Sequence, residues 1–226
     1  MQYQWLSGHM TLTHTLDYER ADRRGLRLTY AEPEGSVRGG VVVLHEVGGV
    51  TEAAEALVTS LATEGWLAVT PHLQDLDGSH SGQDLLGVTD TTLAWLVDDR
   101  GLRGDLLGIV GFDLGGTASL IVASNRELGA AVSVGGRGIG APASPELPAL
   151  VEIAGGLTSP WLGLYGDDGD EAGQAEVERL ADAASAARVA TNVVRYPGVS
   201  HRFDTDPDTA AQAWQRTLAW FDAHLR

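Results

Sequence analysis

The segment Gly111-Phe112-Asp113-Leu114-Gly115-Gly116 has the composition of a sharp turn that presents one side chain for chemistry. It follows the apolar run Leu106–Val110 and precedes a helix-like stretch, Thr117–Ser124. A strand, a glycine-flanked turn and a helix in this order form a nucleophile elbow, whose tip usually carries a nucleophilic Ser. Glycines beside the tip allow the strained backbone that such a turn needs. Here the tip is Asp113, so the pattern predicts an elbow that carries a carboxylate.

Other polar residues follow predicted strands elsewhere in the chain. In a parallel sheet, the carboxyl ends of the strands meet at one edge, and ligands bind there. These side chains are therefore expected to gather around the elbow. They are His45-Glu46, Gly135-Gly136-Arg137, Asp167 to Asp170, and His201-Arg202. The tip residue, the acidic turn and the histidine follow one another in the chain order of a Ser, acid and His triad.

Strands and helices are predicted to alternate along the chain. Strands of apolar and β-branched residues separated by helical segments predict βαβ units and therefore an α/β fold with a mostly parallel sheet. The predicted strands are Leu12–Tyr18, Leu26–Ala31, Val41–His45, Trp66–Thr70, Leu106–Gly111, Ala130–Val134, Trp161–Tyr165 and Thr191–Tyr196. The predicted helices are Thr51–Glu64, with Thr51 as N-cap, Asp84–Val97, Thr117–Ser124, Glu171–Ala187 and Ala210–His224, with Trp214 and Trp220 facing inward.

The composition excludes several classes of site. The chain has no Cys, which excludes disulfides, a thiol nucleophile and thiolate metal sites. It has no Lys, which excludes a Schiff-base lysine and a P-loop lysine. A net charge of −16 argues against binding to nucleic acid or to an anionic membrane surface. The histidines lack the spacing of metal ligands, so neither a metal nor a cofactor is expected.

A chain of 226 residues fits one domain, over residues 1–226. Its first ten residues, which include Ser7-Gly8-His9-Met10, are expected to be disordered or a cloning remnant. No apolar run approaches the roughly 20 residues that span a bilayer, and no signal peptide is visible. A cytoplasmic monomer or homodimer acting on a small molecule is therefore expected. The Gly-rich segment Gly135–Pro160 is too short for a cap domain.

Four motifs in order resemble the dienelactone hydrolase family of the α/β-hydrolase superfamily. Val41–Gly49 resembles the family's "VVLHE-x-x-G" segment, and Glu64–Pro71 its "EGY-x-A-x-x-PDL" segment. Val110–Gly116 resembles the "GFC-x-GG" elbow, and Leu162–Gly166 the strand before the acid. Tyr196–Phe203 resembles the "YPG-x-x-H-x-F" histidine loop. The resemblance covers about residues 12 to 225 and implies an α/β-hydrolase fold with helices on both faces of the sheet and no cap domain.

The resemblance also implies the parts of a catalytic site. His201 takes the place of the family's histidine, and Glu46 that of a glutamate close to the elbow tip. The amides of Val47 and Leu114 correspond to an oxyanion hole. Asp113 stands where the family has Cys or Ser, and the family's acid position is occupied by Gly169. Either of its neighbours, Asp168 or Asp170, is a candidate to orient His201. Arg137 and Arg202 are candidates for substrate binding by position.

Three functions remain open for a carboxylate at the elbow. The favoured one is hydrolysis of a small organic molecule, with Asp113 as nucleophile or base and His201 as general base. A second is a non-hydrolytic lyase, isomerase or cyclase in which Asp113 and Glu46 share a proton. A third is an inactive homologue that binds a ligand. Because the Asp113 carboxylate would occupy the oxyanion hole itself, activated esters are expected to be poor substrates.

Overall fold

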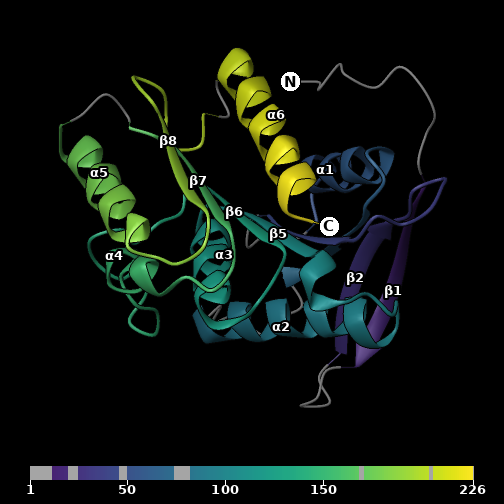
Figure 1. The fold of residues 1–226 in the computed structure, drawn as a ribbon. Coiled ribbons are helices and arrows are strands. Elements are labelled where there is room, and N and C mark those ends of the chain that lie inside the picture. The colour runs from purple at the N-terminus through teal and green to yellow at the C-terminus, as the bar shows by residue number, and fades with distance from the viewer. Residues whose placement is uncertain are drawn as a thin grey trace.

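The computed structural model describes residues 12–19, 25–45, 50–73, 82–167, 171–203 and 206–225. All strands of this part belong to one eight-stranded sheet, in the order β1-β2-β4-β3-β5-β6-β7-β8 (Figure 1). The predicted segment Met1–Met10 lies outside the described residues.

The sheet is antiparallel at one edge and parallel elsewhere. Strand β1 (Thr13–Glu19) pairs antiparallel with β2 (Gly25–Ala31), and β2 pairs antiparallel with β4 (Leu67–Pro71). The remaining neighbours pair parallel. They are β3 (Gly40–Leu44), β5 (Leu107–Phe112), β6 (Ala130–Val134), β7 (Trp161–Gly166) and β8 (Thr191–Tyr196). The predicted antiparallel start and mostly parallel sheet are thereby confirmed.

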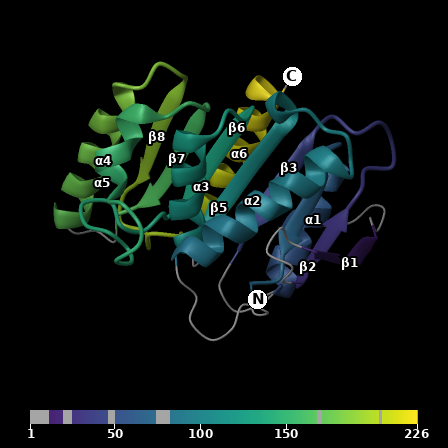
Figure 2. The ribbon, with the colours of Figure 1, turned by 90° about the horizontal axis from the view of Figure 1, so that it is seen from below.

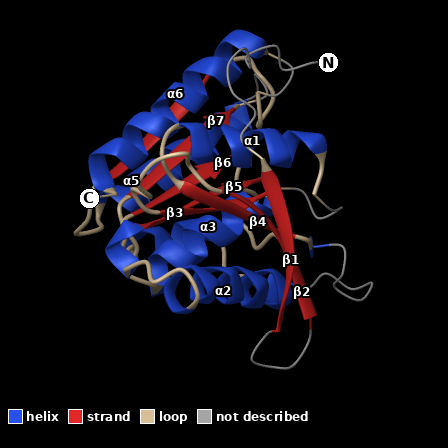
Figure 3. Ribbon diagram, turned by 90° about the vertical axis from the view of Figure 1, so that its right-hand side faces the viewer, coloured by secondary structure: helices blue, strands red, loops and turns tan. Residues whose placement is uncertain are grey.

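Helices cover both faces of this sheet. Helices α1 (Glu52–Thr63) and α6 (Pro207–His224) lie on one face, above the sheet in Figure 3. The other face carries α2 (Gly82–Asp98), α3 (Leu114–Asn125), the short α4 (Leu150–Ile153) and α5 (Glu171–Ser185), and Figure 2 looks onto these four helices. The structure is therefore an α/β-hydrolase-like three-layer fold, as the sequence predicts.

The two faces of β3 show why its sequence is continuously apolar. Val42 and Leu44 belong to the core cluster beneath α2 and α3, whereas Val41 and Val43 belong to the cluster beneath α1 and α6. Successive side chains of a strand point to opposite faces, so a strand covered on both faces needs apolar residues throughout. The resulting central strand is fully buried and ends where the candidate site begins.

Most predicted element boundaries hold within a few residues. Thr51 caps α1 as predicted, since its hydroxyl accepts a hydrogen bond from the Ala54 amide at 3.3 Å. Helix α6 begins at Pro207 rather than at Ala210, because Asp206 acts as its N-cap and accepts from the Thr209 amide at 2.9 Å. Pro at the first helical position suits this start.

The inward face of α6 is built from more residues than the two predicted tryptophans. Trp214 and Trp220 are partly buried and pack against the core cluster as predicted, and the fully buried residues of the helix are Ala213, Thr217, Leu218 and Phe221. The Gly-rich segment Gly135–Pro160 contains α4 and the short 3-10 helix η3 (Ala154–Gly156), which the sequence analysis does not predict. Both elements are too short to produce a helical period in the sequence. In the described part of the chain, no helix combines the length and apolarity needed to cross a membrane.

Candidate active site

The turn between β5 and α3 places Asp113 at the tip of an elbow. Asp113 has φ 53° and ψ −119°, a backbone conformation that is rare for a residue with a side chain. A Cβ on Gly111 would lie 2.0 Å from the carbonyl oxygen of Gly115, and a Cβ on Gly115 would lie 2.4 Å from that of Leu44. The elbow therefore requires glycine at both positions, which explains the motif that predicted it.

A second turn brings His201 and Arg202 to the elbow. The Phe203 amide donates a hydrogen bond to the Ser200 carbonyl at 2.8 Å and closes a turn over the two residues. Phe203 adopts a φ of 46°, which is strained for a bulky residue. The turn packs against the ends of β6 and β7 so closely that a Cβ on Gly166 would lie 1.8 Å from the Ser200 carbonyl oxygen. One short turn thus delivers two adjacent side chains to the site.

The carboxylate of Asp113 contacts three basic side chains. Its Oδ1 lies 2.7 Å from Nε2 of His201 and accepts a hydrogen bond from Nε of Arg137 at 3.1 Å. Its Oδ2 accepts from Nη1 of Arg202 at 2.6 Å. The Asp113 side chain is only 13% exposed, whereas that of Arg137 is 61% exposed. The structure thus brings together four of the predicted site residues.

The surroundings of Asp113 favour its ionised form. Burial by itself raises the pKa of this carboxyl, but hydrogen bonds from Arg202 and His201, together with the charge of Arg202, outweigh burial and hold the pKa below its usual range. An ionised carboxylate only accepts hydrogen bonds, so Nε2 of His201 carries the proton in this contact. In the resting site Asp113 is therefore the acceptor and His201 the donor.

Arg137 is placed by the backbone around it. Its carbonyl accepts a hydrogen bond from the Thr117 hydroxyl of α3 at 2.7 Å. Gly135, two residues before it and directly after β6, has φ 57°, a conformation that glycine adopts without strain. Because Arg137 is mostly exposed, its contact with Asp113 is weaker than the less exposed contact of Arg202.

Asp167 holds the histidine loop, a role that the sequence did not reveal. Its side chain is fully buried at the end of β7, and its Oδ1 accepts a hydrogen bond from the Gly198 amide at 2.8 Å. Its Oδ2 lies 3.7 Å from Nη1 of Arg195 on β8. Asp167 belongs to the acidic turn in which the sequence predicts Asp168 or Asp170, and not Asp167, as a site residue. The available signal was its place directly after an apolar strand.

The other predicted site residues contribute less to the described geometry. Glu46, Val47, Asp168 and Asp170 lie outside the described residues. Leu114 is the first residue of α3, so its amide belongs to the groups at a helix start that lack an intrahelical partner. The His45 ring packs beside the Phe112 ring, with centroids 5.2 Å apart. Within the described ranges, no group of three or more His, Asp or Glu residues is arranged to hold a metal ion.

A model of the dienelactone hydrolase family matches residues 26–225. The chain belongs to this family. It is similar to a protein of Salmonella typhimurium named as a carboxymethylenebutenolidase, with 32% identity over 85% of this chain and 80% of the relative. A relative of the same name from Escherichia coli is also 32% identical, over 80% of this chain and 75% of the relative. The chain is thus a hydrolase-family member of the α/β-hydrolase superfamily.

Solved structures agree with this family assignment. The crystal structure of a Klebsiella pneumoniae protein that is named as a dienelactone hydrolase matches with a TM-score of 0.82 and 28% identity, over 95% of this chain and 99% of the other. Dienelactone hydrolase of Anabaena variabilis matches with a TM-score of 0.71 at 20% identity, over 96% of this chain and 100% of the other, and supports the fold alone. The role of Asp113 at the elbow must therefore be explained for a member of the dienelactone hydrolase family.

Proposed function

We propose that this chain hydrolyses a small electrophilic molecule, with Asp113 as the nucleophile and His201 as the general base. The observation that carries this proposal is the Asp113 carboxylate at the elbow tip, 2.7 Å from Nε2 of His201, with a pKa that its hydrogen bonds to Arg202 and His201 hold below the usual range. A carboxylate needs no base to activate it and attacks a saturated carbon that bears a leaving group. Epoxides, halides and strained lactones belong to this class of electrophile.

The lowered pKa of Asp113 supports a nucleophilic role over a proton-transfer role. A general base works best with a pKa near the working pH, and two carboxylates that share a proton require one pKa to be raised. The contacts of Asp113 with Arg202 and His201 shift its pKa in the opposite direction. The lowered pKa of Asp113 therefore does not support an isomerase or lyase in which Asp113 and Glu46 share a proton.

In the first step an oxygen of Asp113 bonds to the substrate carbon, and the leaving group departs with its electron pair. The carboxylate thereby becomes a neutral ester. Arg202 and Arg137 then lose their anionic partner, so they can stabilise the charge that develops on the leaving group. The amides of Leu114 and Val47 are proposed to serve the ester carbonyl in the second step.

In the second step His201 accepts a proton from water, and the water oxygen bonds to Cγ of Asp113. The ester bond at Cγ then breaks, and the product leaves as an alcohol with the proton from His201. Before this step Nε2 must release the proton that it donates to Asp113 at rest, while Nδ1 carries the one proton of the neutral imidazole, so that Nε2 can accept. The His201 side chain is 42% exposed, so solvent can take that proton once the charge of Asp113 is gone. Asp168 or Asp170 is proposed to orient the imidazole.

A single turnover in water labelled with ¹⁸O tests this mechanism. The wild-type enzyme is mixed in excess with propylene oxide, 2-chloroacetamide or β-butyrolactone, and the peptide that contains Asp113 is analysed by mass spectrometry. Label in Asp113 is expected. The His201→Gln variant is expected to accumulate the substrate ester on Asp113, and Asp113→Asn to form none. Turnover without label would indicate direct attack by water, and binding without turnover would indicate a ligand-binding homologue.

A further inference from the structure

Phe203 ends the turn that carries His201 and Arg202, and its ring is buried in the core. The residue is 4% exposed and belongs to the core cluster beneath α1 and α6. Its backbone has φ 46°, a left-handed conformation that is strained for a side chain of this size. Such strain persists only where the surrounding structure over-determines it, so contacts of Phe203 must offset the strain.

The Phe203 ring packs against Tyr196 at the other end of the histidine loop. The two ring centroids lie 5.0 Å apart with an interplanar angle of 60°, within the range that aromatic pairs favour. Tyr196 is the last residue of β8 and is 9% exposed, so it gives the pair a fixed base on the sheet. Val199, inside the loop, packs against the same core cluster. The aromatic pair therefore closes the histidine loop at its two ends.

Two glycines at the ends of β6 and β7 receive the turn from the sheet side. The Gly166 amide donates a hydrogen bond to the His201 carbonyl at 3.2 Å. A Cβ on Gly135 would lie 2.7 Å from the same carbonyl oxygen. The backbone of His201 thus rests directly against both strand ends. These contacts limit how closely the turn approaches the sheet, whereas the buried ring of Phe203 resists its withdrawal.

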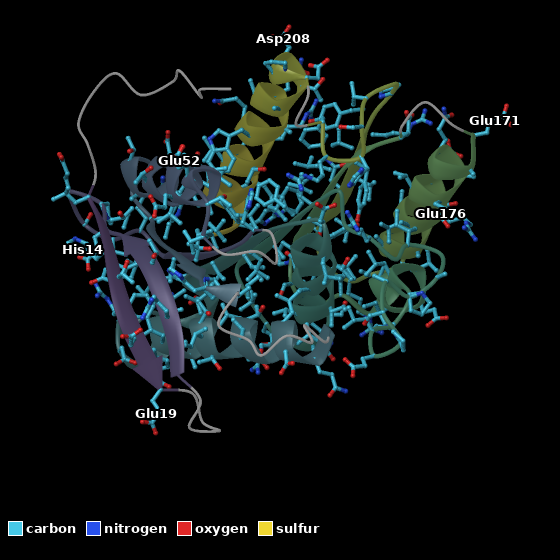
Figure 4. The ribbon with its side chains drawn as sticks, turned by 180° about the vertical axis from the view of Figure 1, so that it is seen from behind. His14, Glu19, Glu52, Glu171, Glu176 and Asp208 are labelled. Atoms are coloured by element: carbon cyan, nitrogen blue, oxygen red, sulfur yellow. The ribbon has the colours of Figure 1, made fainter. Side chains whose placement is uncertain are left out.

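Phe203 also joins the turn to the start of helix α6. Its carbonyl oxygen accepts a hydrogen bond from the Asp206 amide at 3.0 Å, and Asp206 is the N-cap of the helix. Figure 4 labels Asp208 in the first turn of α6, which marks this end of the helix. The ring of Phe203 thus holds the turn to the core, and its carbonyl holds the turn to α6.

We infer that Phe203 is a positioning residue, whose buried ring holds the turn in the strained conformation that brings His201 and Arg202 to the two oxygens of Asp113. The contacts to be held are 2.7 Å from Nε2 of His201 to Oδ1 and 2.6 Å from Nη1 of Arg202 to Oδ2. Both come from the two residues directly before Phe203, so a rotation of the backbone there moves both. The inference rests on the proposed function for the catalytic roles of these residues.

The pKa of the Asp113 carboxyl reports whether these contacts are kept. Burial raises this pKa, but the hydrogen bonds from Arg202 and His201 hold it below its usual range. Loss of the contacts therefore raises the pKa. It is measured through the ¹³Cγ resonance of Asp113 in the wild type, in Phe203→Gly and in Phe203→Leu. Glycine removes the ring but suits a φ of 46°, whereas leucine keeps a buried apolar side chain.

Phe221→Ala is the matched control, because it removes a ring of the same core cluster at a distance from the loop. Phe221 is fully buried, its ring centroid lies 5.8 Å from that of Trp66, and a Cβ on Gly108 near the start of β5 would lie 3.0 Å from its ring. If Phe221→Ala does not fold, Leu218→Ala of the same cluster takes its place.

Phe203→Gly is expected to raise the pKa of Asp113 above the wild-type value, and Phe203→Leu to keep it near that value. Phe221→Ala is expected to lower the free energy of unfolding and to leave the pKa unchanged. With 2-chloroacetamide as substrate, Phe203→Gly is expected to hydrolyse the Asp113 ester about tenfold or more slowly than the wild type, because a small misplacement of His201 slows the attack of water.

A wild-type pKa of Asp113 in Phe203→Gly would overturn the inference, since the backbone alone would then set the turn. An equal rise in Phe221→Ala would also overturn it, since the ring of Phe203 would then serve only overall stability. The titration requires no turnover, so the ¹⁸O experiment can fail while the titration results stand, and the two proposals remain distinguishable.

Discussion

Arg202 and Asp113 form the least exposed ion pair of the site, with Nη1 of Arg202 2.6 Å from Oδ2 of Asp113 and side chains 18% and 13% exposed. The pair lies at the junction of two strained turns, the elbow at Asp113 and the turn that ends at Phe203. A carboxylate at an elbow tip would otherwise be a partly buried charge without a strong counterion. Arg202 therefore stabilises an aspartate at the position where the resembled family motif has Cys or Ser.

Replacing Arg202 with Gln is expected to destabilise the protein and to raise the pKa of Asp113. Removing one partner leaves the Asp113 charge with only His201 and the exposed Arg137. A loss of about 1–3 kcal/mol in the free energy of unfolding is expected, measured by urea denaturation at pH 7. Arg137→Gln is the matched control, and its loss is expected to stay below about 1 kcal/mol because its side chain lies mainly in solvent. Equal effects of the two variants would contradict the assigned role of Arg202.

Stability is expected to fall at acid pH through Asp113. Its folded-state pKa is lowered, so the stabilisation by its ionised form is complete above the unfolded value of about 3.9 and is lost as the pH falls through the folded pKa. Unfolding measured between pH 2 and 7 is expected to show a smaller acid loss in Asp113→Asn than in the wild type. Parallel pH profiles for the two proteins would show that the pKa of Asp113 is not lowered in the folded state.

Gly115→Ala is expected to disrupt the elbow. The added methyl group would lie 2.4 Å from the backbone carbonyl oxygen of Leu44, an atom that cannot move without shifting the central strand β3. Either failure to fold or a loss of several kcal/mol in the free energy of unfolding is expected, as for overpacked cores. Gly35→Ala is the control, because nothing lies within 4 Å of its added methyl group, and it should unfold like the wild type.

The sequence predicts the elements of the fold because their patterns are local. The apolar β-branched run at Val41–Leu44 and the glycine pattern around Asp113 each reflect a constraint within a few residues, so strand and elbow are confirmed. The tryptophans of α6 indicate its inward side, but their spacing does not say that Ala213, Thr217, Leu218 and Phe221 are the residues the helix buries completely.

The contacts of the site could be predicted only in part. The order of the strands brings Asp113, His201, Arg137 and Arg202 to one edge of the sheet, which the sequence implied. That both arginines bind the aspartate, rather than lying open to a substrate, depends on the turn at Ser200–Phe203 and on the exit from β6. These contacts depend on tertiary packing between distant segments, so no periodic pattern in the sequence predicts them.

Asp167→Ala is expected to lower activity through the histidine loop. The substitution removes the acceptor of the Gly198 amide and leaves Arg195 without one of its carboxylate contacts. Because His201 lies three positions after Gly198 in the same loop, kcat is expected to fall more than KM rises, by about tenfold or more. Asp167→Asn can keep the acceptor oxygen and is expected to retain more activity than Asp167→Ala. A change in KM alone would indicate that Asp167 affects substrate binding instead of the histidine loop.

Asp113→Ser is expected to convert the site towards ester hydrolysis. A serine hydroxyl donates to Nε2 of His201, the reverse of the present proton arrangement, and becomes the nucleophile that such an elbow ordinarily carries. It also removes the negative charge of the residue next to Leu114, a charge that would repel an oxyanion at the Leu114 amide. Hydrolysis of p-nitrophenyl acetate is expected to rise at least about tenfold above that of the wild type, a gain of roughly 1.4 kcal/mol in transition-state stabilisation.

The same substitution leaves Arg202 without its anionic partner, so Asp113→Ser is expected to be less stable than the wild type. Adding Arg202→Gln is expected to restore part of the stability, and this non-additivity measures the coupling of the two positions. Rapid hydrolysis of p-nitrophenyl acetate by the wild type, lost in Asp113→Ser, would show that the carboxylate already performs ester chemistry. If Asp113→Ser gains esterase activity, and if its loss of stability is partly restored by Arg202→Gln, the Asp113–Arg202 pair is what keeps the wild type from hydrolysing esters.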